Sequence, residues 1–205
     1  MTTAITKKAG KGTTDGVVSE LATFWDVLPG REEELAAATQ RMVAAIRNVP
    51  AGINIKTGLR DSRHVIFNNG RNLLWATTFE TEWDFYVDDA VLIIGIDVFL
   101  DWLQHTVQGQ DIVNWAKASG ADKFAKDDPE WEALMRKATA QLKAILQANQ
   151  YPATSYFNSL SALLMMQAVN QGRLEEAFQQ VLDDPRAAEA LQHPALKPLL
   201  ELAAA

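Results

Sequence analysis

The sequence predicts an α+β fold with a helical C-terminal third. Three observations lead to that class. Residues 21–27 alternate along a strand-like pattern and precede an acidic helix start. Asn69-Gly70 joins two further strand candidates, and from Leu160 onward the apolar residues recur at helical spacing. We therefore expect a small sheet in the N-terminal part, packed against helices.

The first predicted unit is a strand followed by a helix. The strand runs through residues 21–27, and Leu28-Pro29-Gly30 ends it. The helix begins at the acidic residues 32–34, where negative charge favours a helix N-terminus, and ends before Pro50-Ala51-Gly52. After it, residues 53–56 are either a short strand or an irregular lead-in.

A tight hairpin is predicted next, from two strands over residues 63–67 and 73–79. Asn69-Gly70 tolerates the positive φ values of a type I′ turn. With these two residues in the loop, Asn68 lies opposite Arg71 and His64 lies opposite Trp75. The two facing side chains, His64 and Trp75, then share one face of the sheet.

The remainder of the chain is predicted to be mostly helical, with no internal repeat. We expect, in order, a helix over residues 87–107, a loop or lid over 117–129, a helix from Asp128-Pro129, a possible fourth strand over 151–157, and helices from 160 divided near Asp184-Pro185. The order β-α-β-β-α-(β) is the ferredoxin-like split βαβ arrangement. The predicted organisation is a flexible tail (1–16), a ferredoxin-like domain (17–158) and a helical C-terminal extension of that domain (159–205).

Composition excludes several classes of function. The 205-residue chain has a formal charge of −7 and no cysteine, so it has no disulfide, thiolate nucleophile or cysteine metal site. Negative charge argues against nonspecific nucleic-acid binding. No apolar run approaches the roughly 20 residues that a membrane span needs, and no secretory signal is apparent. We expect a cytoplasmic protein that binds neither nucleic acid nor membrane.

Residues 63–89 resemble a pattern in bacterial dimeric α/β-barrel proteins: Arg-His-Val-Ile-Phe, a turn with Arg71, a strand ending Ala-Thr-Thr-Phe, and Trp-Asp-Phe-Tyr-Val-Asp-Asp. The resemblance covers about residues 17–106. It implies a homodimer, or an internal duplication, with a pocket between sheet and helices. We expect a homodimer or a higher homo-oligomer, because an open ferredoxin-like sheet face needs cover. The superfamily includes cofactor-free antibiotic-biosynthesis monooxygenases, haem-degrading enzymes, chlorite dismutases and dye-decolourising peroxidases. The resemblance fixes no catalytic residue.

Two histidines are the candidate catalytic residues. His64, predicted beside Trp75, is a general base, a haem ligand or a structural strand histidine. His105 follows Asp101 by four residues, a spacing at which a carboxylate can hold an imidazole on one helix face. Haem-binding members of the resembled superfamily use a helical histidine as axial ligand, which implies His105 if haem is bound. The alternative for His105 is a polar residue at a helix edge.

Candidate ligand-binding residues are cationic or aromatic. Arg60 and Arg63 could hold an organic anion or a haem propionate, or form surface ion pairs. The other candidates, which are pocket walls or core residues, are Trp25, Trp75, Thr77 and Trp102. Five carboxylates between Glu80 and Asp89 suggest a metal site or, more simply, helix capping and dipole stabilisation.

These features favour an enzyme by a narrow margin. The first hypothesis is an oxygenase or haem-peroxidase-like oxidoreductase that acts on an apolar or aromatic ligand, with haem or with no cofactor at all. The alternative is a non-enzymatic homo-oligomeric ligand-binding or scaffold protein, because the C-terminal third carries a nearly continuous apolar stretch at residues 160–169.

Overall fold

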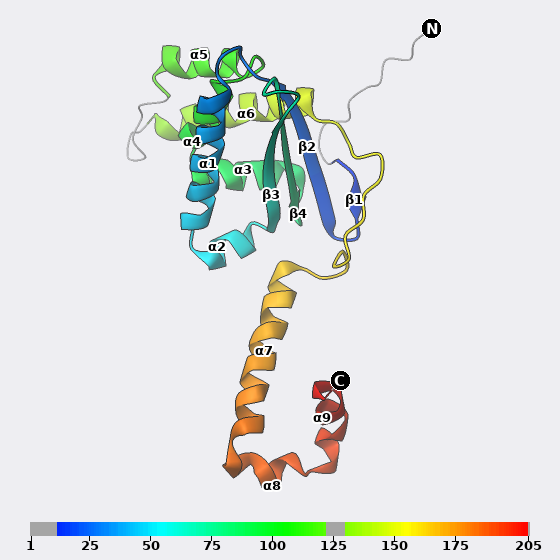
Figure 1. Cartoon of the computed structure of the whole chain (residues 1–205). Coiled ribbons are helices and arrows are strands. Elements are labelled where there is room, and N and C mark those ends of the chain that lie inside the picture. Colours follow the sequence, from blue (N-terminus) through cyan, green and yellow to red (C-terminus); the bar gives the residue numbers. More distant parts are fainter. Residues whose placement is uncertain (1–11, 122–129, 205) are drawn as a thin grey trace. The chain divides into compact units, whose positions relative to one another are not determined.

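A computed structural model of the chain describes residues 12–121 and 130–204 and shows the predicted α+β class (Figure 1). Helices and an antiparallel sheet make up the part before Leu164, and helices alone make up the part after it. The elements are β1 (Thr14–Asp15), β2 (Val18–Asp26), α1 (Glu32–Asn48), α2 (Ala51–Lys56), β3 (Leu59–Phe67), β4 (Asn72–Phe79), α3 (Trp83–Ile94), α4 (Ile96–Leu103), α5 (Gln110–Ser119), α6 (Trp131–Asn149), α7 (Met165–Asp183), η1 (Pro185–Ala187), α8 (Ala188–Leu191), η2 (Pro194–Leu196) and α9 (Lys197–Ala203).

The sheet has the strand order β1-β2-β4-β3, and each neighbouring pair is antiparallel. The register of the predicted hairpin is confirmed, because His64 pairs with Trp75 across β3 and β4. At its turn the Arg71 N–H donates to the Asn68 carbonyl over 3.2 Å. Asn69 and Gly70 have φ of 55° and 85°, as a type I′ turn requires. This register places His64 on the face of the sheet that packs against helices.

The core lies between that face of the sheet and the helices. Its largest fully buried side chains are aromatic and come from both layers: Trp25 and Phe79 from strands, Trp83, Phe99 and Trp102 from α3 and α4. Aromatic side chains remove the most apolar surface from water, about 25 cal/mol per Å². The packed aromatic layer therefore gives β3 and β4 a rigid base.

The opposite face of the sheet carries apolar side chains that remain exposed. Phe24 is 38% exposed, Val65 43% and Phe67 40%. Phe24 makes edge-to-face contacts with Phe67 and with Tyr151, at ring-centroid separations of 6.4 and 5.4 Å. We call the side chains of Phe24, Val65, Phe67 and Tyr151 the open-face patch.

Several elements differ from the sequence-based expectation. The helix predicted over residues 87–107 begins at Trp83 and is divided at Gly95, whose φ of 107° interrupts the helix between α3 and α4. Residues 51–56 form a short helix, α2. The possible fourth strand is absent: only one bridge, between Gln150 and Thr23, joins β2 there. Pro152 has no N–H with which to extend that ladder.

Regular structure begins earlier in the chain than predicted. Residues 14–15, expected to belong to a flexible tail, pair with β2 as β1. The buried carboxylate of Glu20 accepts hydrogen bonds from the Thr13 N–H (2.8 Å) and the Ala153 N–H (3.0 Å). One side chain thus ties two distant segments to the sheet edge. Residues 1–11 of the predicted tail, and 122–129 of the predicted loop, lie outside the described residues.

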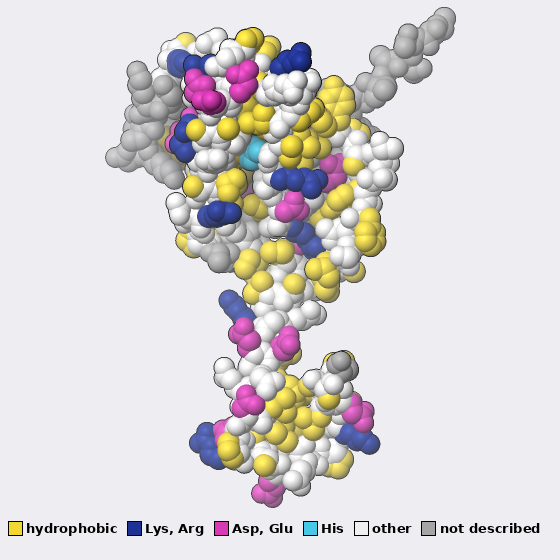
Figure 2. Space-filling model, viewed as in Figure 1, with side chains coloured by type: hydrophobic (Ala, Val, Ile, Leu, Met, Phe, Trp, Pro, Cys, Tyr) yellow, Lys and Arg dark blue, Asp and Glu magenta, His cyan; other side chains and the backbone are white. Residues whose placement is uncertain are grey.

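The residues from Met165 onward form a second unit made only of helices. None of its described residues is buried, and its apolar side chains gather between α7 and α9 (Figure 2). Two turns of this unit share one capping arrangement. Asp184-Pro185 and His193-Pro194 each start a 3₁₀ turn, and each first side chain accepts a bond from the N–H two residues later. Such a unit has little core of its own.

Candidate functional site

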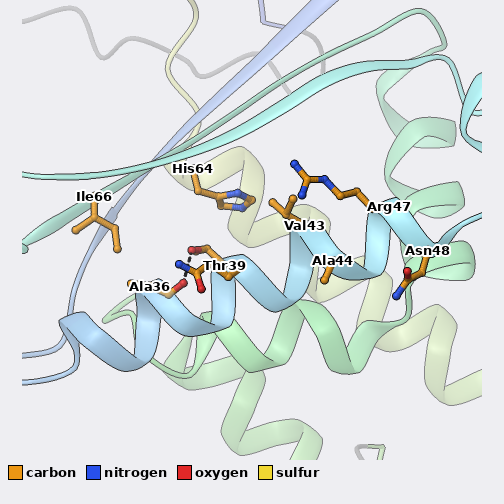
Figure 3. A pocket seen from close by; sticks show the side chains of 9 residues that line it. Ala36, Thr39, Val43, Ala44, Arg47, Asn48, His64 and Ile66 are labelled. Carbon is orange, nitrogen blue, oxygen red and sulfur yellow. Dashed lines mark hydrogen bonds between the residues drawn. The ribbon is translucent and has the colours of Figure 1, made fainter.

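A groove of about 640 Å³ lies between α1 and the edge strand β3 (Figure 3). Two rows of α1 residues at helical spacing form one wall, and two β3 side chains form the other. Figure 2 shows a histidine (cyan) in the hollow between α1 and the sheet. The lining residues are Ala36, Thr39, Gln40, Val43, Ala44, Arg47, Asn48, His64 and Ile66.

His64 is the unusual member of this lining. Its ring stacks on Trp75, with centroids 6.1 Å apart and planes 5° from parallel. Both ring nitrogens are buried, and neither has a hydrogen-bond partner. Burial disfavours the charged imidazolium and lowers the pKa of His64 to about 4. His64 is therefore neutral at pH 7, with one donor and one acceptor that no protein group satisfies.

The tryptophans predicted to bind ligand lie in the core and not in the lining of this groove. Trp75 is 2% exposed and donates its indole N–H to Ser62 Oγ over 3.0 Å. Trp102 is fully buried, lies edge-to-face against His64 at 6.4 Å, and its indole N–H has no partner. Trp25 packs on Trp102 at 4.9 Å. Trp75 and Trp102 therefore contact the His64 ring from the core side, and Trp25 packs against Trp102.

Thr77 also lies in the interior. Its hydroxyl donates to the Asp61 carbonyl over 2.7 Å and lies 2.9 Å from the Tyr86 hydroxyl. Complete burial raises the pKa of Tyr86 to about 12, so this phenol stays protonated. Trp75 and Tyr86 line a second cavity of about 20 Å³, which has room for about one water molecule. We assign Thr77 to this internal network.

The structure places His105 just beyond α4, not on a helix. It is 3% exposed, and its Nδ1 accepts a hydrogen bond from Arg31 Nε over 3.2 Å. Burial and the neighbouring Arg31 lower the pKa of His105. Asp101, the predicted partner, instead pairs with Arg41 at 2.7 Å. His64 and His105 do not share the α1–β3 groove.

The residues present do not fit an axial haem ligand in this arrangement. Iron needs an imidazole nitrogen that a porphyrin can approach. His105 is buried and its Nδ1 holds the Arg31 hydrogen bond, while both nitrogens of His64 are covered. Neither histidine therefore presents a free, accessible nitrogen to haem iron in this structure.

The two arginines predicted to bind a ligand lie in different environments. Arg60 is nearly buried and donates to Glu80 (2.7 Å), to the Leu160 carbonyl (3.1 Å) and to the Leu163 carbonyl. It thereby holds residues 158–163 against the end of β3. Arg63 is exposed and belongs to the set of β3 side chains that alternates with His64, on the open face of the sheet.

Three of the five carboxylates between Glu80 and Asp89 form ion pairs with basic side chains: Glu80, Asp84 and Asp88. Lys143 lies 3.2 Å from Asp84 and 2.8 Å from Asp88, and so joins α6 to α3. The α3 N-cap is Glu82, with no side-chain capping bond. Across residues 12–121 and 130–204, His, Asp and Glu side chains nowhere gather as a group that could hold a metal ion.

Sequence reasoning missed the α1 side of the groove. Arg47 makes no ion pair or hydrogen bond within the described residues, and it is the charged member of the lining. The available signal was the spacing of Thr39, Val43 and Arg47, which places them on one side of α1. That signal alone does not distinguish a groove wall from a solvated helix face.

The fold and the groove define a small α+β protein with a histidine-containing surface site. No known protein family, curated protein or solved structure matches the chain. In the described part of the chain, no helix has both the length and the apolar composition needed to cross a bilayer.

Proposed function

We propose that the protein is a small-molecule-binding enzyme of the ferredoxin-like, dimeric α/β-barrel type, with the α1–β3 groove as its active site. The order of β2, α1, β3, β4 and α3, together with an antiparallel sheet, supports this class. The observation that carries the site is His64, a neutral imidazole with both nitrogens unsatisfied in the wall of a groove. Buried polar atoms without partners are rare enough to require an explanation.

The proposed reaction is an oxidation of a bound aromatic molecule, with His64 as the hydrogen-bond acceptor of its hydroxyl group. A neutral imidazole accepts a hydrogen bond from a phenol, and this polarises the O–H bond of the group that loses electrons. For a hydroquinone, two electrons and two protons pass to O₂, giving the quinone and hydrogen peroxide. The substrate itself is the reductant, so the reaction needs no cofactor.

A substrate reaches a nitrogen of His64 only after side chains move, because both nitrogens are covered. A porphyrin needs a far larger opening than a phenol hydroxyl, because its whole ring plane must approach the nitrogen. Figure 3 shows the Arg47 side chain extending from α1 toward the imidazole. A long, exposed arginine side chain can move without disturbing the core. Hydrogen bonds at catalytic groups commonly form only when the substrate is bound.

Oxygen consumption with 1,4-dihydroxynaphthalene tests this function. We expect the purified protein to accelerate oxygen uptake above the protein-free rate, and His64→Phe to abolish the acceleration. His193→Phe is the matched control, since His193 is exposed in the C-terminal unit. Equal rates for the protein, His64→Phe and buffer would reject the proposed reaction.

We further propose that the protein is a homodimer through the open-face patch. Four large apolar side chains on one sheet face, three of them about 40% exposed, are a typical interaction surface. The alternative function, a non-enzymatic scaffold, is favoured by one observation: no residue between 165 and 204 is buried, and Leu174 and Leu202 are exposed by 70% and 75%. Ligand binding at the groove without turnover would support that alternative.

A further inference from the structure

We propose that the α1–β3 groove binds a hydroxyaryl carboxylate, with the carboxylate on Arg47 and the phenol on His64. This inference rests on the proposed function and specifies its substrate class. It combines three features of the same groove: an unpaired cation, an apolar surface and an unsatisfied neutral imidazole.

Arg47 indicates that one end of the ligand carries a negative charge. It is the charged residue of the lining and has no partner within the described residues. The side-chain amides of Asn48 and Gln40 line the same groove, and in the described structure neither makes a hydrogen bond. A guanidinium without a protein partner suits a carboxylate, which accepts several hydrogen bonds at once.

The helix dipole gives a simpler reason for a cation here, because Arg47 lies in the last turn of α1. That reason explains the sign of the charge at position 47. It does not explain why the cation shares its groove with the unsatisfied nitrogens of His64. An organic anion accounts for both.

The apolar residues of the lining indicate what the body of the ligand is. Val43, Ala44, Ala36 and Ile66 give the groove apolar walls, which suit an aromatic ring better than a sugar or a phosphate ester. A phenol on that ring can donate a hydrogen bond to an unsatisfied nitrogen of His64. Figure 3 shows Arg47 and His64 on the same stretch of the groove, so that one molecule can contact both.

The test compares 6-hydroxy-2-naphthoate with 2-naphthol by isothermal titration calorimetry. The two probes share the ring and the phenol, and only the first carries a carboxylate. We expect the naphthoate to bind about five- to tenfold more tightly, with that advantage decreasing at high salt. In Arg47→Gln the advantage disappears, while 2-naphthol binds as before.

Arg63→Gln is the matched control, because Arg63 is an exposed arginine on the other face of the sheet. This variant should still bind 6-hydroxy-2-naphthoate more tightly than 2-naphthol, by the same factor as the wild type. Equal affinity of the two probes, or an advantage lost in Arg63→Gln and kept in Arg47→Gln, overturns the carboxylate site while leaving the proposed function in place. If neither probe binds, this inference and the proposed function both fail.

Discussion

At the residue scale, His64 combines properties that a purely structural histidine would avoid. An unsatisfied buried polar group costs about 1–3 kcal/mol. His64 has two such nitrogens, and the Trp102 indole N–H beside it has no partner either. Phenylalanine could stack on Trp75 without that cost. The presence of imidazole at this position therefore favours a role in hydrogen bonding to a ligand.

The first prediction at this scale concerns stability against pH. The pKa of His64 falls from 6.5 in the unfolded chain to about 4 in the folded one. Between these values the unfolded state binds the extra proton, so stability is full above pH 6.5 and declines as pH falls toward 4. We expect the wild type to lose about 2 kcal/mol through this residue between pH 7 and pH 5. In urea titrations, the free energy of unfolding of His64→Phe should lack this loss between pH 7 and pH 5. If His64→Phe shows the same pH dependence as the wild type, the pKa assigned to His64 is wrong.

The second residue-scale prediction concerns Arg60. The Arg60 and Glu80 side chains are only 10% and 8% exposed, so Arg60→Ala leaves a carboxylate buried without its cation. We expect a loss of about 3 kcal/mol in the free energy of unfolding. Residues 158–163 should also become susceptible to limited proteolysis. The exposed pair of Arg136 with Glu132 is the control, since Arg136→Ala should cost less than about 1 kcal/mol. Equal costs for both variants would refute this role.

At the element scale, the hairpin shows what local sequence can predict. Asn69-Gly70 fixes both the turn and the register, and hence the pairing of His64 with Trp75. The division of the predicted long helix at Gly95 was not predicted, because an isolated glycine in an apolar run is also compatible with a continuous helix. The groove was missed for a related reason: Arg47 and His64 meet only through tertiary packing.

Alanine substitutions at two glycines, Gly70 in the turn and Gly52 as its control, test the hairpin. Gly70 has φ +85°, and an added Cβ would lie 2.7 Å from Glu32 Cγ. We expect Gly70→Ala to destabilise the protein by about 1–2 kcal/mol in chemical denaturation. Gly52→Ala in α2 is the control, because nothing lies within 4 Å of its added Cβ; it should be neutral or slightly stabilising. The reverse ranking would contradict the turn geometry.

At the scale of the whole molecule, the chain divides into two units that differ in how they bury apolar residues. The unit up to Leu164 has a continuous core, whereas the residues from Met165 onward have none in the described part. The sequence predicted the helical character of the C-terminal third, but the composition of a helix does not reveal whether its apolar face is covered. We expect oligomerisation to cover the open-face patch.

Light scattering after size-exclusion chromatography tests the proposed dimer. We expect twice the chain mass for the wild type and the monomer mass for Val65→Lys, since a charge in the centre of an apolar interface is costly. Val65 is already 43% exposed, so the substitution should leave folding intact. Leu174→Lys in the C-terminal unit is the control. Dissociation by Leu174→Lys and not by Val65→Lys would place the interface on the C-terminal helices instead.

The proposed site depends on His64 being a neutral imidazole with unsatisfied nitrogens in the groove. The most direct measurement is a pH titration of the histidine ring resonances by NMR, with His64→Phe used for assignment. We predict that His64 remains neutral from pH 8 down to about pH 5 and titrates near 4, and that 6-hydroxy-2-naphthoate shifts its ring nitrogen resonances. A pKa near 6.5, together with no response to that probe, would contradict the account.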